Sequence, residues 1–477
     1  ACATACGRAA ARIESRNIPT VVLTREDFVG VTRNAMAGLG FDQDVSMVVF
    51  PIDPFLVDSD ISPIGEALQD FADGLTTWKP AANEIGVKSP PPVAIEANGY
   101  EAAVDKMNRQ FLINTWGDGL PLNPPSVERV DWILSGTGMA RDEIIGKFMP
   151  RGGVATVETI AVSLAMAGGR PEYLPVLIAA VDGFLDPGLE HDKVQATSGS
   201  TYPVIIVNGP IADEIRLNSG FGLLGPDPQH PAGASIGRAL RLLQQNVGGA
   251  LPGVGTMSIF GGMRYTNAVF AEDEAGLPDG WDTVARTQFG FENGENAVTV
   301  VVATGASNIV RRGVGKETAA VEAEQGLRRV ASYLASSNPH YTWGHAEGTP
   351  GVLLMPRVVA RQMNNLGWDK ARIKKFLWEN SKIPWAEVEE SGLKQWIEAA
   401  PHPDTVASSG EDPWAICRKP EQLILTVAGG EHPTHNFWMQ AASAQIAGRK
   451  IGLPENWDAL INTADDELGP RGEMCVI

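Results

Sequence analysis

Two cysteines at the start of the chain are the first residues whose types and spacing suggest chemistry. Cys2 and Cys6 lie at the start of a helix-like segment that continues to Arg16. Unpaired backbone N–H groups and the helix dipole stabilise a thiolate at a helix N-terminus, and the thiolate is the nucleophilic form of cysteine. The alternative is that both thiols only pack at the end of a buried helix. We predict that Cys2 and Cys6 are catalytic.

A second candidate group, Arg170, Glu172 and Tyr173, lies on a short turn between two apolar helix-like segments. A carboxylate and a phenol can move a proton, and a guanidinium group can anchor an anion. The alternative is an Arg–Glu pair that only caps the two helices. We predict that Glu172 and Tyr173 are catalytic and that Arg170 binds substrate.

The central region combines many glycines with side chains that donate hydrogen bonds. Amide, hydroxyl and guanidinium groups suit a small carboxylate or phosphate, and glycine lets the backbone approach a ligand closely. The predicted substrate-binding residues here are Asn208, Asn218, Ser219, Arg238 and Asn246. The segment 220–222 lacks the Lys and the spacing of a phosphate-binding loop, and no G-x-G-x-x-G motif follows the first predicted strand. The sequence therefore identifies no cofactor.

His432 and His435 form an H-x-x-H pattern. Two histidines can bind a metal or act as bases, but a metal site needs further ligands. The alternative is that this segment only forms the start of a helix. We predict no metal site, and His432 and His435 are the candidates if one exists.

Alternating strand and helix patterns predict an α/β fold with Rossmann-like parallel sheets in two or three domains. Predicted strands lie at 19–24, 45–50, 204–207, 297–303, 352–355 and 423–427, and predicted helices at 26–39, 317–336, 357–380 and 435–446. Ligands of open α/β sheets bind beyond the strand ends. We therefore expect 304–308 and 428–432, which follow two of these strands, to line a site.

Turn clusters and changes in composition divide the chain into three predicted domains. Residues 1–110 are expected to form a Rossmann-like domain with a connecting arm, incomplete at its N-terminus because no strand precedes the first helix. Residues 111–295 are expected to form a Gly-rich α/β substrate domain, and 296–477 a C-terminal βαβ domain.

Composition narrows the class of protein. The net charge of −19 argues against a nucleic-acid partner, which requires a concentrated basic surface. No run of 18 apolar residues and no secretion signal is present, so we expect a cytoplasmic protein without membrane contact. Four cysteines are too few for a disulfide framework in a chain of 477 residues. The expected partners are a small polar or anionic substrate and other subunits of a homo- or hetero-oligomer.

The first residues also carry a family resemblance. The block Cys2-Ala3-Thr4-Ala5-Cys6-Gly7, followed by Asn17-Ile18-Pro19-Thr20-Val21-Val22, resembles the UGSC-motif (seleno)proteins. The selenoprotein B subunits of glycine, sarcosine and betaine reductases are distantly similar around this motif. Without a gap, Cys2 aligns with the C of UGSC, so the resemblance places the Sec or Cys nucleophile before Ala1, on residues or a chain that precede it. Cys6 aligns with a later cysteine of the family after a shift of one residue.

The resemblance continues along most of the chain. The segments that carry it are 118–121, 170–173, 207–211, 218–220, 236–239 and 246–249. Where the family has Ala-Gly-Cys, this chain has Ala167-Gly168-Gly169, so that thiol is missing.

The resemblance implies a thiol- or selenol-dependent oxidoreductase or lyase. Such an enzyme would cleave a carbon–heteroatom bond of a small polar substrate reductively, or perform related redox chemistry, with a redox partner. Two alternatives remain open: a thiol-independent lyase or hydratase that uses Glu172 and Tyr173, and a non-catalytic subunit of a larger assembly.

Overall fold

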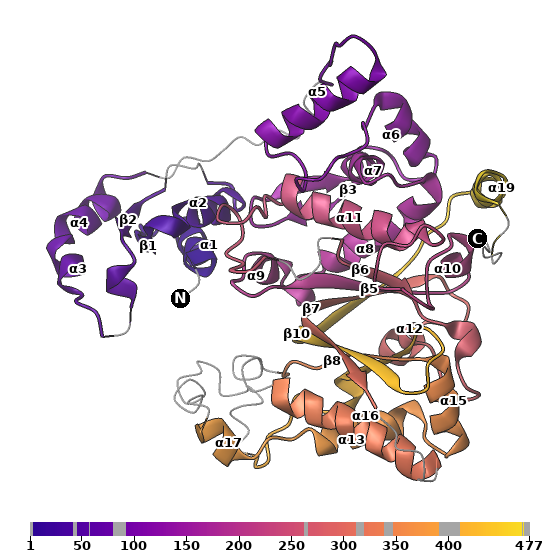
Figure 1. The fold of residues 1–477 in the computed structure, drawn as a ribbon. Helices are drawn as coiled ribbons and strands as arrows, with labels where there is room; N and C mark the ends of the chain where they lie inside the picture. The colour runs from indigo at the N-terminus through magenta and orange to yellow at the C-terminus, as the bar shows by residue number, and fades with distance from the viewer. Residues whose placement is uncertain are drawn as a thin grey trace. The chain divides into compact units, whose positions relative to one another are not determined.

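The computed structural model describes residues 3–41, 45–56, 58–79, 92–261, 266–311, 319–337, 347–390, 411–469 and 471 (Figure 1). The chain forms two compact units. The first unit comprises Ala1–Ser200 and Arg238–Thr266, and the second comprises Thr201–Gly237 and Asn267–Ile477. The chain passes from the second unit back to the first within helix α11 (Pro231–Asn246). The predicted boundary at 110 falls inside helix α5 (Tyr100–Ile113), and the three predicted domains stay a prediction.

The first unit begins with two helices on a pair of parallel strands. Helix α1 (Ala3–Glu14) precedes β1 (Val22–Arg25), and helix α2 (Val29–Ala37) precedes β2 (Met47–Phe50). The strands pair in parallel, as expected for the predicted strands 19–24 and 45–50. A small apolar core joins these elements through Ala10, Ala11, Val22, Met36 and Val45.

Helices make up most of the rest of the first unit. They are α3 (Ser62–Glu66), α4 (Leu68–Thr76), α5, α6 (Val127–Leu134), α7 (Val157–Met166), α8 (Leu174–Phe184) and α9 (His191–Gln195). An antiparallel hairpin, β3 (Ile144–Phe148) and β4 (Gly153–Thr156), accompanies them. Every residue of α8 except Asp182 is buried. A helix that is apolar on all sides lies at the centre of its unit, so α8 is the core element here.

A six-stranded mixed sheet organises the second unit. Its order is β6 (Ala268–Ala271), β5 (Tyr202–Asn208), β7 (Ala297–Val310), β10 (His435–Lys450), β8 (Gly351–Met355) and β9 (Ile424–Val427). The pairs β5–β6 and β8–β9 are parallel. The other pairs are antiparallel because β7 and β10 run against their neighbours. The fold is thus mixed α/β, and this sheet differs from the wholly parallel one that we expected.

The predicted helix 435–446 is wrong, because this segment belongs to the long strand β10. Its Ala and Gln residues favour a helix locally. In the fold, however, β10 pairs with β7 on one side and with β8 on the other. Two neighbouring strands satisfy its backbone groups, and this tertiary context overrides the local preference. Likewise, 304–308 lies inside β7 and is not a loop after a strand.

Two apolar cores cover the two faces of this sheet. On one face, Leu353 and Met355 of β8 pack with α13 (Ala319–Ser337), α15 (Arg357–Asn365) and α16 (Lys370–Asn380), and Figure 1 shows α13 and α16 beside one another below β8. On the other face, Val352 and Leu354 pack with side chains of β5, β6 and β9. Successive side chains of a strand point to opposite faces, which explains this division. The other helices in the described ranges of this unit are α10 (Ile211–Glu214), α12 (Val284–Phe289), α17 (Trp385–Glu390) and α19 (Trp457–Leu468).

A buried carboxylate joins the ends of several elements in the second unit. Glu272, directly after β6, has a fully buried side chain and accepts a hydrogen bond from Lys370 Nζ at 3.0 Å. It also accepts from Asn208 Nδ2 at 2.9 Å and from the Val284 N–H at 2.6 Å. A buried charge is tolerated only when it is paired and hydrogen-bonded. These contacts therefore fix β5, α12 and α16 relative to β6.

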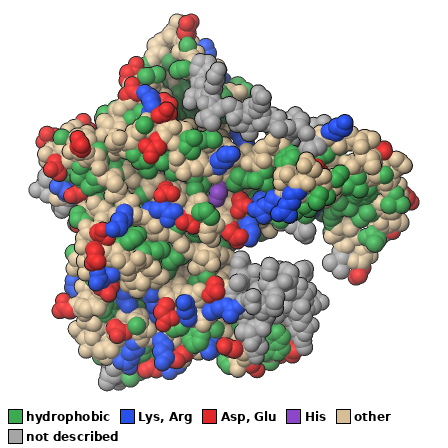
Figure 2. Space-filling model, turned by 180° about the vertical axis from the view of Figure 1, so that it is seen from behind, with side chains coloured by type: hydrophobic (Ala, Val, Ile, Leu, Met, Phe, Trp, Pro, Cys, Tyr) green, Lys and Arg blue, Asp and Glu red, His purple; other side chains and the backbone are tan. Residues whose placement is uncertain are grey.

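No helix in the described ranges is both long and apolar enough to cross a membrane. On the face drawn in Figure 2, Lys and Arg side chains are interspersed with Asp and Glu side chains.

The Glu272–Lys370 pair can be tested by removing its cation. Because breaking a buried pair leaves an uncompensated charge, Lys370→Met should lower the free energy of unfolding by about 3 kcal/mol. Lys375 lies on the same helix with a side chain 68% exposed, so Lys375→Met is the matched control. The control should change stability by less than about 0.5 kcal/mol. Urea unfolding of both variants measures the difference, and equal values would contradict a stabilising role of the pair.

Candidate functional site

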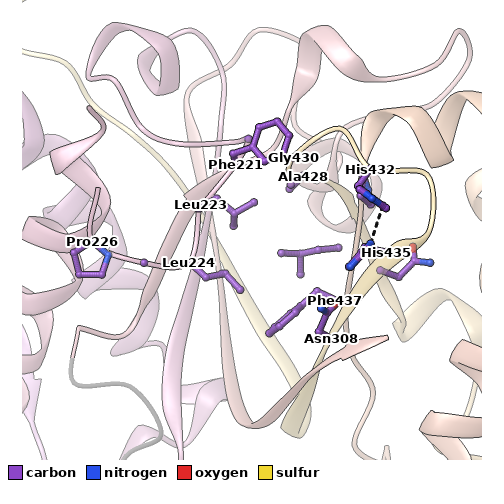
Figure 3. Close-up of a pocket in the computed structure, with 17 residues that line it drawn as sticks. Phe221, Leu223, Leu224, Pro226, Asn308, Ala428, Gly430, His432, His435 and Phe437 are labelled. Carbon is purple, nitrogen blue, oxygen red and sulfur yellow. Dashed lines mark hydrogen bonds between the residues drawn. The ribbon is translucent and has the colours of Figure 1, made fainter. Parts of the chain in front are cut away.

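A cavity of about 640 Å³ lies in the second unit where β8 and β9 end. Its walls come from two loops, 220–226 and 428–432, and from β7, β8 and β10. Most of its surface is apolar. The main apolar side chains are Phe221, Leu223, Leu224, Leu354 and Phe437. In Figure 3, Phe221, Leu223, Leu224 and Phe437 lie around a space that His432 and His435 border on one side.

Glycines allow the two loops to approach one another. The Gly429 N–H donates a hydrogen bond to the Ser219 carbonyl at 2.8 Å, although the two segments are far apart in the sequence. Gly429 has φ +109°, a conformation that favours glycine. A Cβ atom on Gly430 would collide with the ring of Phe221. The Gly-rich sequence of 428–432 is therefore required for this closure of the cavity.

Asn218 holds the first loop in shape. Its Oδ1 accepts from the Gly220 N–H at 2.8 Å, and its Nδ2 donates to the Phe221 carbonyl at 2.8 Å and to Asp227 Oδ2 at 3.2 Å. Burial alone would raise the pKa of Asp227, but hydrogen bonds from His230 and from the Gln229 N–H outweigh burial and lower it. Asn218 is thus a positioning residue in this structure.

Two imidazole rings meet at the edge of the cavity. The Nδ1 atoms of His432 and His435 lie 2.9 Å apart, and the rings are nearly perpendicular with centroids 4.3 Å apart. The Thr434 hydroxyl lies 2.9 Å from the Nδ1 of His432 and 3.0 Å from the Nδ1 of His435. The loop after β9 presents His432, and the first residue of β10 is His435.

This arrangement can share a proton. A hydrogen bond between two imidazole nitrogens requires one Nδ1 to carry the hydrogen and the other to accept it. Within the described ranges, no hydrogen bond uses the Nε2 atom of His432 or of His435. The pair can therefore accept a proton at one Nε2 and supply a proton from the other. Asn308, opposite Phe437 in the register of β7 and β10, adds an amide to the same cavity.

The predicted group on the turn 170–173 lies in the interior of the first unit. Arg170 Nε donates to Glu172 Oε1, and the Arg170 guanidinium lies 5.6 Å from the ring centroid of Trp132. Glu172 is 2% exposed and Tyr173 is 1% exposed. The structure thus shows a buried ion pair here, and catalysis by Glu172 and Tyr173 and substrate binding by Arg170 stay predictions.

Three other predicted substrate-binding residues already have partners within their own units. Arg238 donates to both oxygens of Asp118, at 2.7 and 3.0 Å, and Asn246 Oδ1 accepts from the Gly117 N–H at 2.8 Å. Asn208 donates to the Glu272 carboxylate. Asn218 and Ser219 do not line the cavity in the second unit, but they directly precede the loop 220–226 that does, and Asn218 shapes that loop.

Neither predicted thiol is among the described residues that line this cavity. Cys2 lies outside the described residues. Cys6 is a free, partly buried cysteine of α1 that packs against the apolar core of β1 and β2. Its catalytic role stays a prediction. Among the described residues, no three His, Cys, Asp or Glu side chains are grouped as a metal site would require.

Two features of the cavity were not predicted from the sequence. Phe221, Leu223 and Leu224 interrupt a Gly-rich loop, and such apolar residues in a loop are a signal for a binding surface. Thr434, between the two histidines, is the second feature, since its hydroxyl contacts both rings.

Comparisons with models of protein families, with curated proteins and with solved structures gave no match for this chain.

For the Asp118–Arg238 pair, we predict a contribution to the free energy of unfolding that depends on pH. Burial tends to raise the pKa of Asp118, but hydrogen bonds from Arg238 and from the Leu120 N–H outweigh burial and lower it. Because charge-assisted hydrogen bonds contribute about 2 kcal/mol, Arg238→Met should lower the free energy of unfolding by roughly that amount at neutral pH. A carboxylate with a lowered pKa stabilises the fold above its unfolded pKa of 3.8, and this stability is lost as the pH falls through the folded pKa.

Urea unfolding of wild type and Arg238→Met at several pH values measures this effect. The difference should be constant above about pH 5 and should shrink below about pH 4. Arg141→Met is the control, because Arg141 pairs with Glu158 through a side chain that is 51% exposed. Exposed pairs contribute less than about 1 kcal/mol. If both variants lost the same stability, Arg238 would be free for a ligand and the structural role would be wrong.

Proposed function

We propose that this protein is an enzyme that uses the His432–His435 pair for acid–base catalysis on a small molecule in the 640 Å³ cavity. The observation that supports this proposal best is the pair of imidazoles, hydrogen-bonded to one another at the edge of an apolar cavity. Small-molecule sites are typically apolar cavities of this size with few polar groups. Histidine is the most frequent acid–base residue of enzymes.

The reaction class that suits two proton carriers is the elimination or addition of water, as in a lyase or hydratase. One imidazole Nε2 accepts a proton from a carbon atom of the substrate, and the C–H electrons form a carbon–carbon double bond. The neighbouring C–O bond breaks at the same time, and its oxygen takes a proton from the second imidazole and leaves as water. The first ring then passes its Nδ1 hydrogen to the Nδ1 of the second ring, so that both rings are neutral and their tautomers are exchanged. Loss of a proton to water from the first Nε2, gain of a proton from water at the second Nε2, and return of the Nδ1 hydrogen restore the starting state.

The cavity walls favour a substrate with an apolar or aromatic body and one polar end. Phe221, Leu224 and Phe437 contact the body, and Asn308 is in place to bind an oxygen. Among the described residues that line the cavity there is no Lys or Arg. We therefore favour a substrate of low charge over a multiply charged anion.

The thiol-dependent reaction is a second proposal, because Cys6 is a free and partly exposed cysteine in α1. It predicts that Cys6→Ser or alkylation abolishes turnover, whereas catalysis by the histidine pair predicts that turnover survives both changes. A cytoplasmic location, a redox partner, assembly into an oligomer and a purely structural role in a larger assembly are further proposals from the sequence.

Substitution of the histidines tests the proposed chemistry. Alcohols with an apolar body, and the alkenes that they form by loss of water, are incubated with the protein in D₂O and followed by NMR. Loss of a general acid or base costs about 100- to 10,000-fold in rate, so His435→Gln and His432→Gln should each lower turnover by that range. Thr434→Val should have a smaller effect because both rings remain. Full activity in both histidine variants would contradict acid–base catalysis by the pair.

Filling the cavity tests the place of binding separately from the chemistry. Leu224→Trp adds an indole ring to the cavity wall and should weaken the binding of small apolar compounds, measured by ligand-detected NMR, by at least about tenfold. Leu453→Trp is the matched control, because Leu453 is 39% exposed and does not line the cavity. Equal binding by the two variants would show that these compounds bind elsewhere.

A further inference from the structure

A second cavity, of about 380 Å³, lies in the same unit and involves different residues. It is enclosed by α12, α16, β10 and the 3-10 turn η7 (Pro420–Gln422). Its polar side chains include Thr287, Gln288, Lys370, Lys374, Lys419 and Glu421. Three of these residues, Lys370, Lys374 and Lys419, are lysines. This is unusual for a cavity that is only a packing defect, because such cavities are normally apolar.

Lys370 and Lys374 lie four residues apart on α16 and so share a face of the helix. Their partners differ. Lys370 donates to the Glu272 carboxylate at 3.0 Å and to the Asp282 carbonyl at 2.6 Å. Lys374 Nζ donates to the Glu421 carbonyl at 3.3 Å, and no carboxylate of the described residues lies within ion-pair distance of it. Lys374 is only 4% exposed, so it is a buried ammonium group without a carboxylate partner.

Burial and, to a smaller extent, the positive charge of Lys370 lower the pKa of Lys374 to about 8. The carboxylates of Glu421 and Glu272 act against this shift. Burial raises the pKa of Cys417 to about 12, so this thiol stays uncharged near neutral pH. A substantial fraction of Lys374 is therefore the neutral amine at a pH where exposed lysines are almost fully protonated.

We propose that Lys374 is a reactive site that captures the carbonyl group of a small aldehyde or ketone in this cavity as an imine. The neutral amine attacks the carbonyl carbon, a C–N bond forms, and the electrons of the C=O double bond move to oxygen. Proton transfer from nitrogen to oxygen gives a carbinolamine. The carbinolamine hydroxyl then takes up the remaining N–H proton and leaves as water, so that the C–O bond breaks while the C=N bond forms. Nothing is oxidised or reduced, and hydrolysis reverses each step.

Two features of the cavity favour this reaction. A lysine that is desolvated and close to another cation is an activated amine nucleophile. The 380 Å³ volume of the cavity that Lys374 lines is large enough for a small carbonyl compound. The proposal does not depend on the histidine pair, because the two cavities share no lining residue.

The test is reductive trapping on the full-length protein. Acetaldehyde and sodium cyanoborohydride convert an imine into a stable N-ethyl lysine, which peptide mass spectrometry locates. At about pH 7.5, Lys374 should be ethylated at least about tenfold faster than Lys375, its exposed neighbour, because far more of it is the free amine. This preference should fall towards pH 10, where exposed lysines also lose their proton.

Two variants keep this test falsifiable. Lys374→Arg retains a cation but forms no stable imine, so the fast ethylation should be lost while the thermal unfolding temperature stays near that of wild type. Lys375→Arg should leave the fast ethylation of Lys374 intact. An ethylation rate of Lys374 at or below that of Lys375 in the wild-type protein would overturn the proposal, whatever the stability of the variants.

Discussion

The second unit depends on one buried carboxylate, that of Glu272. It accepts hydrogen bonds from β5 through Asn208, from α12 through the Val284 N–H and from α16 through Lys370. The Val427 N–H, at the end of β9, lies 3.4 Å from it. A buried ion costs several kcal/mol unless such donors surround it. The ends of these elements therefore have little freedom to move. They also support both cavities: the loop 428–432 of the first cavity continues from β9, and Lys374 of the second lies one turn after Lys370 on α16.

The residue after Glu272 extends the same constraint to the histidine pair. Asp273 accepts two hydrogen bonds of 2.6 Å from Arg357, at the start of α15, and its N–H donates to the Val427 carbonyl at 2.8 Å. The hydrogen bonds with Asp273 raise the pKa of Arg357, and burial only partly opposes this effect. Arg357 also lies 3.5 Å from Glu431, next to His432. The loop that carries His432 is thus held at both β9 and α15, which gives the proposed catalytic group a rigid support.

The sequence predicts a helix or strand best where the local preference of its residues agrees with the structure that the tertiary packing requires. The β-branched runs of β1, β5 and β9 are strands in the structure, whereas the Ala- and Gln-rich β10 is a strand only because β7 and β8 flank it. The two Gly-rich loops of the cavity were identified separately, but the hydrogen bond between Gly429 and Ser219 that joins them exists only in the fold. Arg238 was interpreted as an anion-binding residue because its partner, Asp118, is 120 residues away in the sequence. The sequence did not predict Lys374 as a reactive residue, because its reactivity depends on burial and the neighbouring residues in the sequence do not indicate that burial.

The distribution of carboxylates explains which polar groups remain available for chemistry. Arg170, Arg238, Arg357 and Lys370 each donate a hydrogen bond to a carboxylate partner. Lys374 has a backbone carbonyl as its acceptor and can release its proton at moderate pH. Among the described residues, no carboxylate lies within ion-pair distance of His432 or His435, so each ring has the other as its partner. A carboxylate beside either ring would favour the protonated form of that ring. In a chain of net charge −19, these three basic groups lack a carboxylate partner among the described residues, and the proposed proton transfer and amine chemistry depend on this feature.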